Sequence, residues 1–321
     1  TWKRVVDMND RALRDIIIGL GGRSEGIPRE SGFDITAASE VMAILCLASD
    51  IPDLKARLGR IVVGYTSDGV AVTAGQLGAV GAMAALLSQA IKPNLVQTTE
   101  GAPAFVHGGP FANIAHGTNS ITATRAALSY ADIVVTEAGF AFELGAEKFF
   151  DINCRYGGFA PACTVLVTTI RALKMHGGKP LAEVSKPDVE AMTRGFSNME
   201  KHIESIRKFG QACVVAINGF PTDTAEEVAA LQQHCARLGV EAVAAEPFSK
   251  GGSGCVELAK VVRDLVARTE PGFTPLYEWS DTIEHKIATV AREMYGAQAV
   301  DYTARAKRDL EQLQKAGFDK L

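Results

Sequence analysis

The chain has 321 residues, 47% of them hydrophobic, and its 33 Lys and Arg against 37 Asp and Glu give a formal net charge of −4. This acidic balance excludes the basic surface typical of nucleic-acid binding, so we expect no nucleic-acid partner. The apolar runs fall short of the roughly 18 residues of a membrane span, so we also expect no membrane partner. The length corresponds to about two domains.

The six cysteines are spread along the chain and form no CxxC pair. Cys46, Cys163 and Cys213 lie inside apolar runs. Buried free thiols in a reducing compartment explain this usage better than a disulfide framework or a zinc site. No spacing of His, Cys and carboxylate residues suggests a transition metal. We therefore expect a cytoplasmic protein without a transition-metal site.

The first third of the chain predicts a helix, a hairpin and a second helix. The segment 37–49 (AASEVMAILCLAS) follows Asp34 and Thr36, either of which can cap a helix there. The segment 60–74 (RIVVGYTSDGVAVTA) contains Asp68-Gly69 between two apolar stretches, and this pair is typical of a β-hairpin turn. The segment Ala74–Ile91 is rich in alanine and leucine and predicts another helix.

The rest of the chain alternates apolar runs with amphipathic segments. Strands are predicted at 131–139, 162–170, 212–218 and 240–247. Helices are predicted at Val189–Phe209, Asp223–Leu238 and Val256–Thr269, and two or three polar helices follow residue 279. Strands alternating with helices of this length predict an α/β fold with a largely parallel sheet flanked by helices.

The segment Gly101–Ser120 has an unusual composition, with two histidines, two prolines and four glycines. Glycine costs backbone entropy and proline removes a donor, so neither a helix nor a strand favours this composition. Glycine is useful where the backbone closely approaches another group, which can be a strand or a ligand.

Three predicted strands end in segments that can bind a ligand, because ligands of parallel sheets bind outside the carboxyl ends of the strands. These segments are 137–149, 218–224 (NGFPTDT) and 247–254 (PFSKGGSG). The last two resemble the base-contacting loops of P-loop nucleotide hydrolases, which makes Asn218, Lys250, Gly251 and Gly252 candidates for nucleotide binding. Phe220 and Phe248 can stack on a flat heterocycle. Alternatively, both rings are core residues at strand ends.

The chain contains no G-x-x-x-x-G-K-[ST] phosphate loop, and the Gly251–Gly254 run lacks the lysine that would follow it. A more specific resemblance rests on four long blocks. They are VDMNDRALR (6–14), GIPRESGFDITAASEVMAILCLASD (26–50), KPNLVQTTEGAPAFVHGGPFANIAHGTNSI (92–121) and RALKMHGG (171–178). With FPTDT (220–224) and KGGSG (250–254), these blocks resemble the formate–tetrahydrofolate ligase family over essentially the whole chain.

The resemblance implies a P-loop-NTPase-like ligase that uses ATP, with its Mg²⁺, to join formate to tetrahydrofolate through formyl phosphate, in one-carbon metabolism. Family members carry the Walker-type loop and a catalytic arginine upstream of Thr1 and continue past Leu321. This chain is therefore expected to be a middle section of the enzyme and, by itself, to lack activity. Bacterial members are commonly homotetramers, so a homo-oligomer, dimer or tetramer, is expected.

The resemblance also implies site residues. The family's folate pocket corresponds here to Phe140, Phe220, Pro221 and Phe248, although the last position is usually tryptophan. Phe142-Glu143 stands where the family commonly has Ala-Asp, and the extra bulk is expected to narrow the pocket.

The Gly101–Ser120 loop is expected to lie beside formyl phosphate, with His107, Asn113 and His116 as donors or proton acceptors. The alternative is that these polar groups satisfy a buried turn.

Three functional regions follow from this resemblance. Residues 1–130 are expected to form a helical and hairpin part of the nucleotide-binding domain, 131–278 a parallel α/β region for folate and the nucleotide base, and 279–321 a C-terminal helical segment. A non-catalytic folate- or nucleotide-binding module, or a scaffold, derived from the same fold is the alternative function. A partitioning-type ATPase is a third hypothesis, and the continuous match at 92–121 argues against it.

Overall fold

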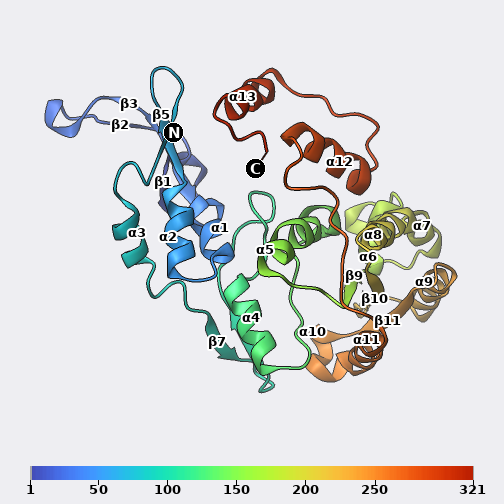
Figure 1. Cartoon of the computed structure of the whole chain (residues 1–321). Coiled ribbons are helices and arrows are strands. Elements are labelled where there is room, and N and C mark those ends of the chain that lie inside the picture. Colours follow the sequence, from blue (N-terminus) through green and yellow to red (C-terminus); the bar gives the residue numbers. More distant parts are fainter. Residues whose placement is uncertain (1, 321) are drawn as a thin grey trace. The chain divides into compact units, whose positions relative to one another are not determined.

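The computed structural model describes residues 2–320, which form two compact units (Figure 1). Unit 1 comprises Thr1–Phe159, Tyr277–Arg292 and Ala297–Leu321, and unit 2 comprises Ala160–Leu276 and Glu293–Gly296. The functional regions 1–130, 131–278 and 279–321 stay a prediction. None of the helices in residues 2–320 combines the length and the apolar character that crossing a membrane requires.

Unit 2 is built on a three-stranded parallel sheet in the order β11-β10-β9. Its strands are β9 (Cys163–Thr168), β10 (Ala212–Asn218) and β11 (Glu241–Ala245), which confirms three of the four predicted strands. The central strand β10 is buried from Val214 to Ile217, as expected for a parallel strand covered on both faces. The predicted α/β class and parallel pairing are confirmed here.

Helices cover both faces of this sheet. They are α6 (Ile170–His176), α7 (Val189–Arg194), α8 (Phe196–Lys208), α9 (Ala225–Arg237), the short α10 (Pro247–Lys250) and α11 (Val256–Arg268). Val215 and Ile217 pack with apolar residues of α6 to α9, while α11 contacts all three strands. Because side chains alternate along a strand, Val214 and Ala216 point to the other face.

The predicted helix Val189–Phe209 is interrupted at Gly195, so α7 and α8 are separate. A Cβ at Gly195 would collide with the carbonyl of Leu173 in α6, and a Cβ at Gly177 would collide with the carbonyl of Ala191 in α7. The chain breaks here because two backbones approach more closely than any other residue allows.

Unit 1 contains four two-stranded sheets. They pair β1 (Arg4–Val6) with β4 (Phe33–Ile35), β2 (Ile16–Ile18) with β3 (Arg29–Ser31), β5 (Val62–Tyr65) with β6 (Ala71–Thr73), and β7 (Asn94–Gln97) with β8 (Pro103–Val106). Among the described strands of unit 1, only β1 and β4 pair in parallel. The hairpin predicted at Asp68-Gly69 is confirmed, with Gly69 in the left-handed region at φ 85°.

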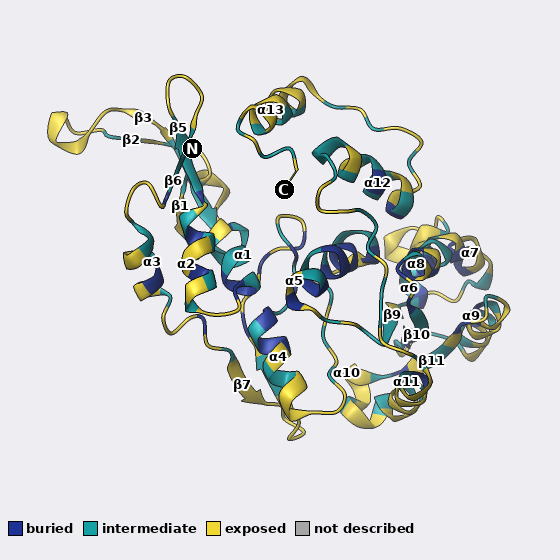
Figure 2. Cartoon of the chain, viewed as in Figure 1, coloured by how far each residue is buried: buried dark blue, intermediate teal, exposed yellow. Residues whose placement is uncertain are grey.

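The helices in the unit 1 segments are α1 (Glu40–Leu47), α2 (Ile51–Gly59), α3 (Val80–Leu86), α4 (Ile121–Tyr130), α5 (Arg155–Gly157) and α13 (Ala304–Lys315). Helix α12 (Ile283–Tyr295) also follows residue 279, which confirms the predicted C-terminal helices. Helix α13 carries no buried residue, as its yellow and teal colours in Figure 2 show. Two π-helical turns, Ala141–Ala146 and Phe149–Cys154, precede α5.

Three sequence predictions for unit 1 are wrong in part. The segment 131–139 is not a strand, because no other strand among residues 2–320 pairs with it, and Val135 is left 81% exposed. Ser39, rather than Asp34 or Thr36, caps α1, because 36–38 form a 3-10 turn that frees the Ser39 hydroxyl to accept from the N–H of Met42 at 3.1 Å. The helix predicted at 74–91 is limited to α3, since Gly78 adopts φ 69° before it.

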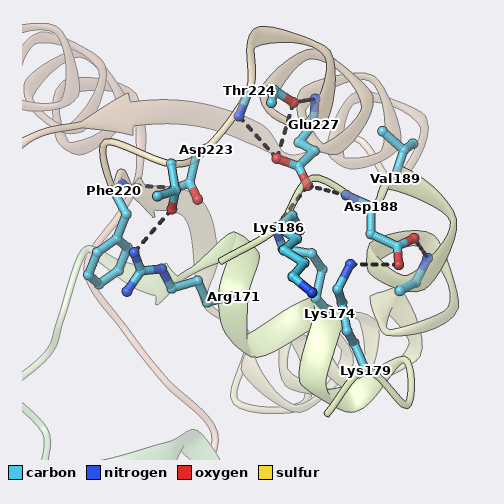
Figure 3. A network of polar contacts seen from close by, with 12 residues as sticks. Arg171, Lys174, Lys179, Lys186, Asp188, Val189, Phe220, Asp223, Thr224 and Glu227 are labelled. Atoms are coloured by element: carbon cyan, nitrogen blue, oxygen red, sulfur yellow. Dashed lines mark hydrogen bonds and ion pairs between the residues drawn. The ribbon is translucent and has the colours of Figure 1, made fainter. Parts of the chain in front are cut away.

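A buried ion pair connects α6 with α9 in unit 2 (Figure 3). Lys174 Nζ lies 2.9 Å from Glu227 Oε1 and also donates to the carbonyl of Lys186 at 3.0 Å. Glu227 additionally accepts from the N–H of Asp188 and from both the N–H and the hydroxyl of Thr224. Burial alone would raise the pKa of Glu227, but these hydrogen bonds and Lys174 outweigh it and lower the pKa.

We expect Glu227→Ala to lower the free energy of unfolding of unit 2 by about 3–5 kcal/mol, because it leaves the Lys174 ammonium buried without a counter-charge. Urea unfolding followed by circular dichroism measures this change. Lys260→Met is the control: its partner Glu257 is exposed, so the expected loss is below about 0.5 kcal/mol. Equal unfolding midpoints for the two variants would contradict the prediction.

Candidate functional site

In unit 2 the candidate site lies at the carboxyl ends of β10 and β11. The N–H of Gly219, which follows β10, donates to the carbonyl of Ala245, the last residue of β11, at 2.9 Å. The loops that begin there, Phe220–Thr224 and Pro247–Gly254, therefore leave the same edge of the sheet. This is the edge at which parallel α/β proteins bind ligands.

The loop Phe220–Thr224 is held by hydrogen bonds at both of its ends. The N–H of Phe220 donates to Asp223 Oδ2 at 2.8 Å, and the N–H of Asp223 returns to the carbonyl of Phe220 at 2.9 Å. Thr224 and Glu227 then form a capping box at the start of α9. Pro221 is exposed at the tip of this loop. The loop is thus a defined turn that presents Phe220 and Pro221.

Arg171, in the first turn of α6, contacts this loop. It is not among the site residues predicted from the sequence. Its guanidinium carbon lies 4.0 Å from the centroid of the Phe220 ring, and its Nη2 donates to Thr222 Oγ1 at 3.0 Å (Figure 3). The spacing of Arg171 and Lys174 in the RALK block, on one side of a helix, is the only sequence signal that could have indicated it.

The Phe248 side chain is 99% exposed, so it is no core residue. It lies in α10, directly after Glu246 and Pro247, and the glycine-rich turn Gly251–Cys255 follows it. Phe220 is half-buried beneath Arg171. For Phe248 the exposure therefore excludes the core role that the sequence left open.

The residues predicted to bind a nucleotide lie on both strand ends. Asn218 is the last residue of β10 and pairs in register with Ala245 of β11. Lys250 Nζ lies 2.9 Å from Glu246 Oε1 in an exposed ion pair, a type that stabilises proteins little. Gly251 adopts φ 57°, the left-handed conformation that glycine permits, and Gly252 belongs to the 3-10 turn that follows.

In unit 1, His107 is a buried residue with both ring nitrogens engaged. Nε2 lies 2.6 Å from the carbonyl of Ala90 and must donate to it, and Nδ1 lies 2.6 Å from the Ser120 hydroxyl. Ser120 in turn caps α4 by accepting from the N–H of Ala123. These contacts are those of a polar group that satisfies a buried turn, the alternative left open for this loop.

His116 is buried as well, but its Nε2 has no hydrogen-bond partner. Burial, together with the nearby Lys148 charge, lowers the pKa of His116 to about 4, so its ring is neutral at pH 7. Lys148 itself donates to the carbonyl of Ala112. The third predicted residue of this loop, Asn113, is exposed.

Two glycines of the Gly101–Ser120 loop leave room for side chains of the protein rather than for a ligand. A Cβ at Gly108 would collide with the sulfur of Cys46, and a Cβ at Gly117 would collide with Ala112. Both glycines have positive φ. The segment also contains strand β8, so the expectation that its composition excludes a strand is wrong for Pro103–Val106, where Pro103 begins the strand.

Phe140 is 67% exposed and opens the first π-helical turn of unit 1. Gly139 before it and Ala141 after it have φ 81° and 60°. Ala141 is the only non-glycine residue among 2–320 with positive φ, a conformation that costs free energy and clusters at binding sites. Phe140 thus lies on a strained segment of backbone, although unit 1 holds it and unit 2 holds the other three predicted folate residues.

Sequence reasoning also missed a buried acidic group, Glu147, seven residues after Phe140. Burial, reinforced by the nearby Asp151 carboxylate, raises the pKa of Glu147 to about 8. Tyr277 hydrogen-bonds to Glu147, and burial also raises the pKa of this phenol. The spacing of Glu147 and Asp151, four apart within an apolar run, was the available signal. No group of three or more His, Cys, Asp or Glu within residues 2–320 is arranged to hold a metal.

The stability of unit 1 is expected to depend on pH through His116. The unfolded chain takes up a proton on this ring near pH 6.5, whereas the folded ring stays neutral to about pH 4, so stability falls as the pH is lowered through that window. From pH 7 to pH 5 the wild type should lose about 1–2 kcal/mol more than His116→Gln.

Urea midpoints of both proteins at the two pH values measure this difference. Glu147, whose raised pKa makes stability fall with rising pH, acts in the opposite sense but equally in both proteins. An identical pH dependence of the two proteins would show that His116 is not buried in neutral form.

The model of the family described as formate–tetrahydrofolate ligase matches residues 1–321, the whole length of the chain. The match includes the Gly101–Ser120 loop of unit 1 and both strand-end loops of unit 2. Ligases of this family use ATP, with Mg²⁺, to join formate to tetrahydrofolate in one-carbon metabolism. The chain belongs to the formate–tetrahydrofolate ligase family.

Proposed function

We propose that this protein binds tetrahydrofolate and Mg-ATP and belongs to a ligase that formylates tetrahydrofolate at N10 through formyl phosphate. The chain by itself, which contains no G-x-x-x-x-G-K-[ST] phosphate loop, is proposed to be inactive. The observation that carries the proposal is the family match over all 321 residues. The exposed aromatic side chains at the strand ends of unit 2 support it, because a reduced pterin is a flat heterocycle that binds by stacking.

The reaction has two steps. An oxygen of formate attacks the γ-phosphorus of ATP and ADP leaves, which gives formyl phosphate. The N10 nitrogen of tetrahydrofolate then attacks the formyl carbon, inorganic phosphate leaves, and N10 gives up its proton. Mg²⁺ enters with ATP as part of the substrate. The protein's task in such phosphoryl and acyl transfers is to position the reactants and to neutralise developing charge.

For folate we propose Phe140 in unit 1 and Phe220, Pro221 and Phe248 in unit 2. All four lie half-buried or exposed, where a ligand can reach them. A stacked aromatic contact contributes about 0.5–1.5 kcal/mol beyond the area that it buries. Phenylalanine at position 248 offers less area than the tryptophan usual in the family, so tetrahydrofolate should bind more weakly than in a protein with that indole.

For the nucleotide we propose Asn218, Lys250, Gly251 and Gly252. The Asn218 amide can bond to the edge of a base, and the lack of a side chain at Gly251 and Gly252 lets a ligand approach the backbone closely. The Lys250–Glu246 pair is weak because both side chains are exposed, so an anionic ligand can compete with Glu246 for the ammonium.

For formyl transfer we propose the Gly101–Ser120 loop of unit 1. His116 is neutral at pH 7 and its Nε2 has no hydrogen-bond partner, so this nitrogen can form a hydrogen bond with a reacting group. Asn113 offers an exposed amide. His107 orients the loop through Ala90 and Ser120, so its contribution to the reaction is positional.

The proposal includes the functional regions 1–130, 131–278 and 279–321, a cytoplasmic location and a homo-oligomer, either a dimer or a tetramer. Free buried Cys46, Cys154 and Cys235 support a reducing compartment. Burial raises the pKa of Cys46 to about 11, so its thiol stays unreactive at neutral pH.

Calorimetric titration with tetrahydrofolate tests the pocket. Phe248→Ala should raise the Kd about tenfold or more without changing the urea midpoint, because the ring is exposed, and Phe248→Trp should lower the Kd. Leu181→Ala, which truncates another exposed apolar side chain of unit 2, is the control and should leave the Kd unchanged.

Mass spectrometry of a mixture with formate, Mg-ATP and tetrahydrofolate tests the chemistry: the chain by itself should form no formylated folate and release no ADP, because it contains no phosphate loop. An unchanged Kd for tetrahydrofolate in Phe248→Ala would contradict the proposed pocket. ADP release without formylated folate would contradict the proposed reaction.

A further inference from the structure

Arg171 lacks the partner that an arginine in its surroundings normally has. Its charge faces no carboxylate within ion-pairing distance among residues 2–320, and its Nε is buried without a hydrogen-bond partner. Its contacts are the Thr222 hydroxyl and the face of the Phe220 ring (Figure 3). A buried donor left unsatisfied costs free energy, so the placement over the ring needs an explanation beyond stability.

The Arg171 side chain and the Phe220 loop are both fixed by the same buried ion pair. Lys174, one turn after Arg171 in α6, pairs with Glu227. Glu227 is the third residue of α9 and closes the capping box with Thr224, the last residue of the loop. The Arg171 guanidinium and the Phe220 ring therefore have a fixed relative position before a ligand binds.

We propose that Arg171 is the positioning residue for the heterocycle of the substrate: it covers one face of Phe220, so the heterocycle stacks on the opposite face. The inference rests on the proposed folate site and deepens it. Because Arg171 holds both the ring and, through Thr222, the loop, the ring loses little rotational freedom when the pterin binds. A cation placed over an aromatic ring is attracted by its quadrupole, which keeps the pair together.

A double-mutant cycle on the full chain tests this role, with tetrahydrofolate titrated calorimetrically. Arg171→Met keeps the aliphatic stem and removes the charge and the Thr222 bond, and it should raise the Kd about three- to tenfold. Phe220→Leu should weaken binding at least as much. The double variant should bind no more weakly than Phe220→Leu alone, because Arg171 acts through the ring.

Arg171→Lys separates the role in binding from a general effect on folding. A lysine keeps the positive charge over the ring but lacks the planar fork, so it should recover part of the lost affinity. Arg263→Met, which removes an exposed arginine of α11, is the control and should bind like the wild type. If Arg171→Met fails to fold, Thr222→Val removes the hydrogen bond alone and should raise the Kd about two- to threefold.

Each outcome decides between the two claims. Binding that is weakened by Phe220→Leu but not by Arg171→Met or Thr222→Val would overturn the inference and leave the folate site standing. Additive effects of Arg171→Met and Phe220→Leu would also overturn it, since Arg171 would then act without the ring. Tetrahydrofolate binding that is absent, or indifferent to Phe220→Leu, would overturn the proposed site and the inference together.

Discussion

The buried pair of Lys174 and Glu227 is the interaction on which the candidate site of unit 2 depends. Removing two charges from water is costly, and it is offset here because Glu227 accepts hydrogen bonds from Lys174, from the N–H of Asp188 and from Thr224. One side chain thus joins α6, the residue before α7 and the start of α9. The Phe220–Thr224 loop ends at this junction, and Arg171 lies in the first turn of the helix that carries Lys174.

The candidate residues divide into those held by several contacts and those held by fewer. Phe220 is fixed by neighbours on its face and along its backbone, whereas Phe248 is exposed on the short helix of an otherwise glycine-rich segment. Unit 1 shows the same division between His107, whose two nitrogens are bonded, and His116, whose Nε2 is not. Two histidines of one loop, both buried, therefore differ in whether a ring nitrogen is left without a hydrogen-bond partner.

The elements that the sequence predicted well are those whose signal is local. β9, β10 and β11 are continuous apolar runs, and the helices between them have a regular apolar spacing. The segment 131–139 carries the same signal, but a strand also requires a neighbour, and that depends on the rest of the chain. Gly195 divided a predicted helix because of the carbonyl of Leu173, which no pattern within 189–209 records.

The candidate site was predictable as a set of loops but not as a set of contacts. Strand ends, exposed aromatics and the family blocks indicated Phe140, Phe220, Pro221 and Phe248. Arg171 and Thr222 are 51 residues apart in sequence, so their contact arises only when α6 packs beside the end of β10. Likewise, nothing in the Gly101–Ser120 composition distinguishes His107 from His116, because the difference lies in Ala90 and Lys148.

The complete burial of Lys174 makes it a natural reporter of motion. Its ammonium has no exposed surface, so an amine-reactive reagent can modify it only when unit 2 opens, while exposed lysines such as Lys186 and Lys260 react directly. The labelling rate of this single amine, relative to the exposed ones, would measure the free energy of the opening event. A residue that holds the site together thereby also records how often it comes apart.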